Sequence, residues 1–136
     1  MHLETERLIL RKFEENDAER MFLMDSDPEV MKYIGVPTLS DISESQNVIR
    51  MIRQQYAENG IGRLAVIEKE SNLLIGWSGL KLLTQEINGY QNVYDLGYRF
   101  LPEYWGKGYA SESAGASLDF GFNGLKIDII YAHGSF

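Results

Sequence analysis

The sequence predicts an α/β protein of the α+β type, with a mixed, largely antiparallel, twisted sheet flanked by helices. Two patterns predict this class. Short segments with alternating apolar and polar residues are typical of strands, and they stand beside segments whose apolar residues recur at helical spacing. The predicted order is β-α-α-β-β-β-α-β. Short connections in the middle favour antiparallel neighbours, and a final strand–helix–strand unit favours a parallel pair.

The first predicted elements are a strand and a helix. Arg7–Phe13 is short and rich in branched residues, which indicates the strand. Asn16 or Asp17 can cap the helix, which is expected to end before Asp27. Its apolar residues at helical spacing are Ala18, Met21, Phe22 and Met24.

A second helical turn is expected over Glu29–Tyr33, and a longer helix follows it. Ser40 or Asp41 offers the cap of this longer helix, with Glu44 close behind, and the helix is expected to end near Gly60. One face of the helix is apolar and carries Val48, Ile49, Met51, Ile52 and Tyr56.

Strands dominate the middle of the chain. Arg63–Lys69 and Leu73–Leu83 flank a short polar turn and predict a β-hairpin. Val93–Phe100 predicts a further strand, in which Gly97 interrupts the row of side chains. This glycine is compatible with a β-bulge, with close approach of a ligand, or with packing against a neighbouring element.

The last predicted elements are a helix from about Gly108 to Phe122, ended by Gly124, and the strand Ile127–Ala132. The helix carries an apolar stripe of Ala110, Ala114, Leu118 and Phe122.

Composition limits the class of protein. The 136 residues are 44% hydrophobic, which fits a single domain over residues 1–136. Twenty acidic against 13 basic residues give a net charge of -7, which opposes binding to nucleic acid or anionic lipid and favours cationic partners such as amines. The absence of cysteine excludes disulfides and a thiolate nucleophile. No stretch approaches the roughly 18 apolar residues of a membrane span, so we expect a cytoplasmic protein without a membrane partner.

The segment from Trp105 to Ala110 carries the clearest chemical signal. It contains two glycines and follows a strand where a helix begins, so its main-chain N–H groups can bind an anion such as a phosphate. A P-loop is excluded because Gly106-Lys107 is followed by Gly108. A dinucleotide-binding fingerprint would need glycine or alanine at Ser111 and an early βαβ unit. A glycine-rich helix start without a ligand stays open at this point.

Several segments in the same order resemble the GCN5-related N-acetyltransferase (GNAT) superfamily, in its branch similar to the RimJ/RimL ribosomal-protein acetyltransferases. Gly108-x-Ala110 matches the end of the family's loop, and Trp105 stands where the loop has Gln or Arg. The other matching segments are residues 4–11, residues 27–31, Leu74-Ile75-Gly76, Leu96-Gly97-Tyr98 and residues 102–112. The resemblance runs from about residue 3 to residue 133.

The resemblance implies that acetyl-CoA is the cosubstrate and lies where two strands splay apart. Main-chain groups near Phe100 and Leu101 would pair with the pantetheine arm. The pyrophosphate would lie on the loop formed by Trp105, Gly106, Lys107, Gly108, Tyr109, Ala110 and Ser111. Because the main chain does the binding, the side chains of Lys107 and Tyr109 are expected to be replaceable.

The resemblance also implies direct transfer of the acetyl group to a primary amine, from a protein N-terminus or a small molecule. Asp95 stands where this branch has a glutamate and is the predicted catalytic base, acting through water. Tyr94 and Tyr98 are expected to be core aromatics. No metal site is expected, because His2 and His133 lie far apart in the sequence.

The family normally continues past the fifth strand with a helix and two further strands, whereas this sequence stops at Phe136. The resemblance therefore implies a fold without its last strands and helix, in which the general acid has no candidate. The bare strand edge favours a homodimer. The alternative function is a non-catalytic relative that binds CoA or a partner protein. The acceptor is expected to be chosen by the loops around Ile34–Ser40 and Thr84–Asn92.

Overall fold

The computed structural model describes residues 2–32, 37–84 and 93–132, which form a sheet of six strands flanked by helices. The strands follow one another across the sheet in chain order, and all neighbours are antiparallel except β5 and β6, which are parallel. The predicted α/β fold class is therefore confirmed. The strands are β1 (His2–Glu4), β2 (Leu8–Arg11), β3 (Leu64–Glu68), β4 (Leu73–Leu83), β5 (Val93–Phe100) and β6 (Ile130–Ala132).

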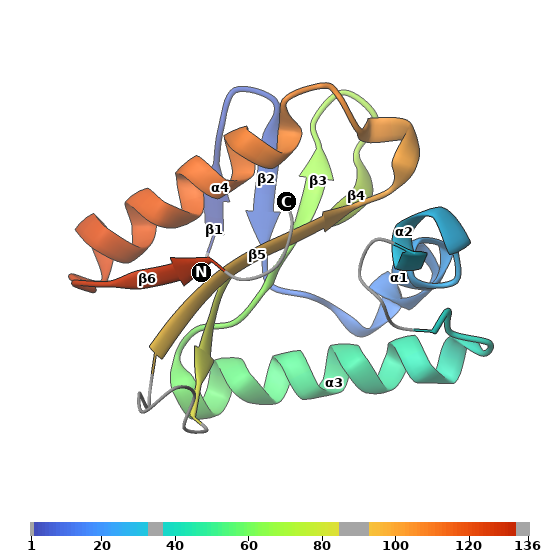
Figure 1. The fold of residues 1–136 in the computed structure, drawn as a ribbon, viewed down its shortest axis with the longest axis horizontal. Helices are drawn as coiled ribbons and strands as arrows, with labels where there is room; N and C mark the ends of the chain where they lie inside the picture. The colour runs from blue at the N-terminus through green and yellow to red at the C-terminus, as the bar shows by residue number, and fades with distance from the viewer. Residues whose placement is uncertain (1, 33–36, 85–92, 133–136) are drawn as a thin grey trace.

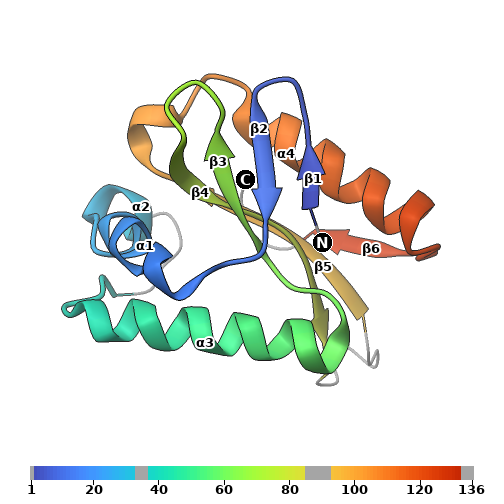
Figure 2. The same ribbon diagram turned by 180° about the vertical axis from the view of Figure 1, so that it is seen from behind.

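The helices cover both faces of this sheet. They are α1 (Ala18–Asp25), α2 (Pro28–Lys32), α3 (Ile42–Asn59) and α4 (Tyr109–Asp119). Figures 1 and 2 show α4 on one side of the twisted sheet and α1 to α3 on the other. Short 3-10 helices, η1 (Glu15–Asp17) and η2 (Pro102–Tyr104), precede α1 and α4. No helix in the described ranges is long and apolar enough to cross a membrane.

Helix α3 begins and ends at the residues that its sequence predicts. Asp41 and Glu44 form a reciprocal capping box, so Asp41 rather than Ser40 is the cap. Gly60 ends the helix with a φ of 71°, the left-handed conformation that favours glycine. Ile49 and Ile52 are buried as expected, but the prediction for Met51 is wrong, because its side chain is 57% exposed.

The two faces of the paired strands β4 and β5 contact different helices. Leu80 and Leu96 are cross-strand partners and pack with Ala114 and Leu118 of α4. Residues of the opposite parity point to the other face. There Arg99 reaches Asp25 of α1, with 2.7 Å between Nη1 and Oδ1. The β4–β5 pair therefore separates the α4 side of the molecule from the α1–α3 side.

The sequence missed β1, a strand of three residues that forms by pairing with β2, in which Leu3 lies opposite Leu10. Both terminal strands of the prediction are also shorter in the structure than expected. Residues Leu8–Arg11 form β2, within the predicted Arg7–Phe13, and only Ile130–Ala132 pair with β5.

Helix α4 continues into a π-helical turn (Phe120–Gly124) that the sequence did not predict. The main-chain N–H of Leu125 donates to the Phe120 carbonyl at 2.9 Å, five residues back. This wider turn changes the angular phase of the side chains. The prediction that Phe122 belongs to the buried stripe is therefore wrong, since its side chain is 41% exposed.

Candidate functional site

The predicted anion-binding segment is an exposed loop that opens α4. The strand β5 ends at Phe100, η2 follows, and α4 begins after Gly108, which is its N-cap. Gly106 and Gly108 have φ values of 75° and 82°, a backbone conformation in which a side chain is strained. Residues 105–108 are all exposed. The glycines therefore give the loop a sharply turned main chain that an anion can approach closely.

The first turn of α4 presents main-chain donors at this loop. The first intrahelical bond runs from the Glu112 N–H to the Gly108 carbonyl, at 3.0 Å. The N–H groups of Tyr109, Ala110 and Ser111 precede that bond and have no intrahelical acceptor. No side chain among the described residues caps this end of the helix. With the positive end of the helix dipole, these donors form a site for a phosphate-sized anion.

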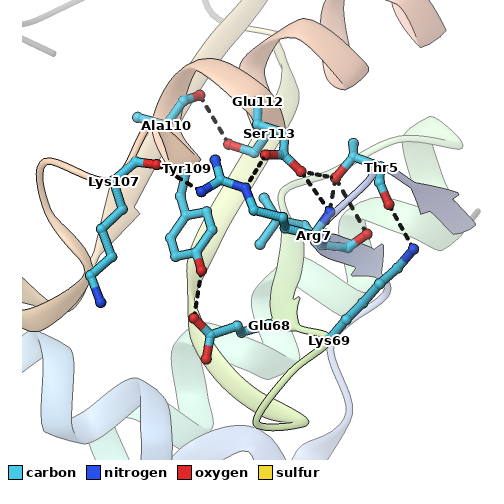
Figure 3. Close-up of polar contacts among 10 residues, drawn as sticks. Thr5, Arg7, Glu68, Lys69, Lys107, Tyr109, Ala110, Glu112 and Ser113 are labelled. Carbon is cyan, nitrogen blue, oxygen red and sulfur yellow. Dashed lines mark hydrogen bonds and ion pairs between the residues drawn. The ribbon is translucent and has the colours of Figure 1, made fainter.

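The side chain of Tyr109 anchors the loop to the sheet. Its ring is buried, and its hydroxyl donates to Glu68 Oε2 at 2.6 Å. Figure 3 shows this contact between the loop and the sheet. This hydrogen bond raises the pKa of the Tyr109 phenol and lowers the pKa of the Glu68 carboxyl. The side chain of Tyr109 therefore has a structural role in holding the loop, and its replaceability for cofactor binding stays a prediction. Lys107 differs, because it is exposed and its amine lies 5.7 Å from the centre of the Tyr104 ring.

Within residues 2–32, 37–84 and 93–132, no strand pairs with the last part of β5 on the side away from β4, so this edge beside the loop is called the open edge. β6 pairs with β5 only at residues 94–96 of β5, and Figure 1 shows β5 extending past it. The Leu101 N–H donates to the Ile75 carbonyl at 3.0 Å, so Leu101 turns its amide toward β4. Main-chain groups alternate along a strand, so those of Phe100 point to the open edge. The Phe100 carbonyl accepts a hydrogen bond from Trp105 Nε1 at 2.8 Å. The main chain of Phe100 thus faces the open edge, whereas the Leu101 N–H already donates a hydrogen bond to β4.

The predicted base, Asp95, lies on the other face of the sheet. It is buried, and its Oδ2 lies 2.6 Å from Nη2 of Arg63. Nη1 of Arg63 also donates to the main-chain carbonyls of Asp95 and Gly79. Burial lowers the pKa of the Arg63 guanidinium, and its hydrogen bond with Asp95 opposes that effect. The Asp95 carboxylate is therefore one half of an interior ion pair.

Arg63 also explains Gly97. A Cβ at this position would lie 3.0 Å from Nη2 of Arg63. Of the three explanations left open by the sequence, packing against a neighbouring element is the one that the structure supports.

Comparison with known proteins decides the family. The protein-family model of the acetyltransferase (GNAT) domain matches residues 7–134 of this chain. The chain belongs to the GNAT family. It is 38% identical over 130 residues to the uncharacterized N-acetyltransferase p20 of Bacillus licheniformis, an alignment that covers 96% of this chain and 71% of that protein. The uncharacterized N-acetyltransferase YoaA of Bacillus subtilis is 32% identical, with the same coverage of 96% and 71%.

Solved structures share the fold of this GNAT domain. A GNAT-family acetyltransferase from Bacillus anthracis superposes with a TM-score of 0.78 at 32% identity, covering 97% of this chain and 72% of that one. The spermidine N-acetyltransferase of Vibrio cholerae, solved in complex with CoA and spermine, superposes with a TM-score of 0.72 at 24% identity. That alignment covers 96% of this chain and 73% of the other, and it shows the likeness of the fold.

The GNAT domain also carries an interior cluster that the sequence did not indicate. The guanidinium groups of Arg63 and Arg99 both lie over the ring of Trp77, each 5.3 Å from the ring centre. Arg99 pairs with Asp25, whose pKa is raised by burial, an effect that the Arg99 charge opposes. These residues are up to 74 positions apart in the sequence, so no local pattern brings them together. The cluster joins β4 and β5 to α1.

The remaining predicted site residues have simple positions. Ser111 is exposed on the first turn of α4, and Ala110, Tyr94 and Tyr98 are half-buried. No group of three metal-ligating side chains occurs within residues 2–32, 37–84 and 93–132. Two loops are expected to choose the acceptor. Residues 34–36 of the first and residues 85–92 of the second lie outside the described residues, as does His133.

Proposed function

We propose that this GNAT domain is an N-acetyltransferase that moves an acetyl group from acetyl-CoA to a primary amine. The observation that carries the proposal is the exposed row of main-chain donors at the start of α4, preceded by two left-handed glycines. A diphosphate needs several donors and close approach to the main chain, and this segment offers both. The residues of the loop, from Trp105 to Ser111, therefore fit the pyrophosphate of CoA.

The open edge of β5 suits the rest of the cosubstrate. An extended pantetheine arm can pair with a strand edge as an added strand does. The main chain of Phe100 faces this edge, and the indole of Trp105 is fixed against it by the hydrogen bond to the Phe100 carbonyl. We propose the main-chain N–H of Phe100 in this role, and not that of Leu101, because the Leu101 N–H already donates to the Ile75 carbonyl.

The reaction that these residues support is direct acyl transfer. The acetyl thioester supplies the electrophilic carbonyl, which the unprotonated amine attacks. The C–N bond forms, the C–S bond breaks, and the thiolate takes up a proton as CoA-SH leaves. In this proposal, a main-chain N–H on the open edge of β5 stabilises the oxyanion that develops on the carbonyl. Asp95 stays a prediction as the base that receives the amine proton through water.

A homodimer, a cytoplasmic location and the choice between a protein N-terminus and a small amine stay predictions as well. The homodimer prediction follows from β6, whose outer edge can pair with a strand of a second copy. The net charge of -7 favours a cationic acceptor.

Paired glycine variants test the donor row. Gly108→Glu adds a side chain and a negative charge to the backbone of the proposed pyrophosphate loop, at a φ of 82° that disfavours any side chain. Gly60→Glu is the matched control, because Gly60 has a φ of 71° and ends α3, a helix on the other side of the sheet. Both variants carry the same backbone strain. Acetyl-CoA affinity is measured by calorimetry for the wild type and both variants.

The wild type is expected to bind acetyl-CoA, G60E to bind it equally well, and G108E to lose at least about tenfold in affinity. Transfer is then measured as CoA-SH release with a mixture of primary amines and peptides, and mass spectrometry identifies the acetylated product. A wild type that is not stabilised by saturating acetyl-CoA contradicts the proposal. Binding without release of CoA-SH would support the non-catalytic alternative.

A further inference from the structure

Arg7 lies against the outside of the proposed pyrophosphate loop, although it is about 100 residues away in the sequence. It occupies the turn between β1 and β2, and its Nη1 donates to the Lys107 carbonyl at 2.9 Å. Its guanidinium carbon also lies 4.3 Å from the centre of the Tyr109 ring. Figure 3 shows the side chain extending from the turn to the start of α4.

The bond to Lys107 fixes the direction of one donor in the loop. In a trans peptide the carbonyl of one residue and the N–H of the next point in opposite directions. No peptide bond among the described residues is cis. Holding the Lys107 carbonyl toward Arg7 therefore turns the Gly108 N–H away from Arg7. A Cβ on Gly108 would lie 3.4 Å from Nη2 of Arg7, so the guanidinium closes the back of the loop.

Glu112 holds Arg7 in this place. Its Oε1 lies 2.7 Å from Nε of Arg7, and its Oε2 accepts hydrogen bonds from the Arg7 main-chain N–H at 3.0 Å and from the Thr5 hydroxyl. Burial raises the pKa of Glu112, but the bonds from Thr5 and Arg7 outweigh it, so the pKa of Glu112 is lowered overall. Glu112 lies in the first turn of α4, where its charge would oppose a bound diphosphate. Arg7 neutralises that charge beside the proposed diphosphate site.

We propose that Arg7 is a positioning residue for the cosubstrate: it orients the Gly108 N–H toward the diphosphate and neutralises Glu112 beside it. This inference rests on the proposed function, because it assigns the diphosphate of CoA to the loop. The sequence carries Arg7 within the segment of residues 4–11 that resembles the family, but no pattern there indicates a contact with the loop.

The experiment compares Arg7→Gln with Arg50→Gln, two losses of one arginine charge. Arg50 is the matched control because its side chain is 60% exposed and pairs with Glu15 at 3.8 Å, away from the loop. Affinities are measured for CoA and for pantetheine, which lacks every phosphate. The order parameter of the Gly108 amide is measured by NMR relaxation in the ligand-free protein.

R7Q is expected to bind CoA about tenfold more weakly than the wild type, the size typical of a lost hydrogen bond to a charged group. Its pantetheine affinity stays within twofold, and R50Q matches the wild type for both ligands. The order parameter of Gly108 falls from a rigid value of about 0.85 toward 0.6 in R7Q only. If R7Q does not fold, Arg7→Lys, which keeps the charge but cannot bond Lys107 and Glu112 together, is expected to lose about threefold for CoA alone.

Equal losses for CoA and pantetheine would mean general damage to the fold and would overturn the inference, as would an R7Q protein that binds CoA normally. A wild type that binds no CoA refutes the proposed function instead. In that case the order parameter still decides whether Arg7 holds the loop, because it is measured without ligand. An unchanged Gly108 amide in R7Q shows that it does not.

Discussion

The ion pair with Arg63 gives Asp95 a structural role beside its predicted role as the base. Its carboxylate and the Arg63 guanidinium are both largely buried, with side-chain exposures of 10% and 13%. Removing one charge from a buried pair leaves the other without compensation, which is more damaging than removing an exposed pair. A structural role and a role as base therefore predict different losses for the same substitution.

Asp95→Asn is expected to lower the free energy of unfolding by about 3 kcal/mol, because the buried Arg63 charge loses its partner. The matched control is Glu15→Gln, which removes an exposed carboxylate paired with Arg50 and is expected to change stability by less than about 0.5 kcal/mol. Urea denaturation measures both variants. An Asp95→Asn protein as stable as the wild type would show that the ion pair contributes nothing.

Kinetics on the same variant separate the two roles. If Asp95 is the base, kcat of D95N loses its dependence on pH under conditions where the protein is folded. If Asp95 only holds the sheet, the pH profile of kcat keeps its shape.

At this scale the sequence could predict which positions form the loop but not what their side chains contact. Gly106 and Gly108 were identifiable because a left-handed backbone selects glycine locally. The bonds from Tyr109 to Glu68 and from Arg7 to Glu112 join residues that are 41 and 105 positions apart. Such contacts depend on the packing of the whole sheet, so local spacing does not contain them.

Among the elements, the β4–β5 pair is the one that sets the geometry of the open edge. Gly76 lies opposite Phe100, and a Cβ at Gly76 would lie 2.2 Å from the main-chain carbonyl oxygen of Arg99. A backbone atom cannot move aside as a side chain can. The two strands can therefore approach this closely only because residue 76 is glycine, and Phe100 takes its position from that approach.

Gly76→Ala is expected to destabilise the protein by about 3 kcal/mol through this clash and to weaken acetyl-CoA binding. Gly115→Ala is the control within α4, where a Cβ meets no atom within 4 Å and the glycine is exposed. Because alanine favours the helix, this variant is expected to gain up to about 1 kcal/mol. Denaturation midpoints compare the two. A Gly76→Ala protein that resembles Gly115→Ala would contradict the close approach of β4 and β5.

The elements themselves were largely predictable, because caps and periodicity are local signals. The β3–β4 hairpin, β5 and α3 lie close to where the sequence places them. The failures have non-local causes. β1 depends on pairing with β2, and the π-helical turn joins α4 to the chain before β6 through the bond from the Ile127 N–H to the Gly121 carbonyl. Periodicity assumes a constant helical phase, so it placed Phe122 on the wrong face.

For the whole molecule, the charge and the local site act in opposite directions. The chain carries a net charge of -7, and CoA is a polyanion, so their long-range interaction is repulsive. The donors of the loop and the Arg7 guanidinium attract phosphate only at close range. Salt shortens the Debye length from about 30 Å at 10 mM to about 8 Å at 150 mM, which screens the distant charges far more than the contacts at the loop.

The association rate of CoA is therefore expected to rise about two- to fivefold between 10 and 150 mM salt, while its dissociation rate changes less. Stopped-flow measurement of both rates tests this, with uncharged pantetheine as the ligand whose association rate should not change. An association rate that falls with salt would mean that Arg7 and Lys107 dominate the field at the loop. The net acidity of the chain would then not govern the approach of its cosubstrate, and the charge argument for a cationic acceptor would lose its main support.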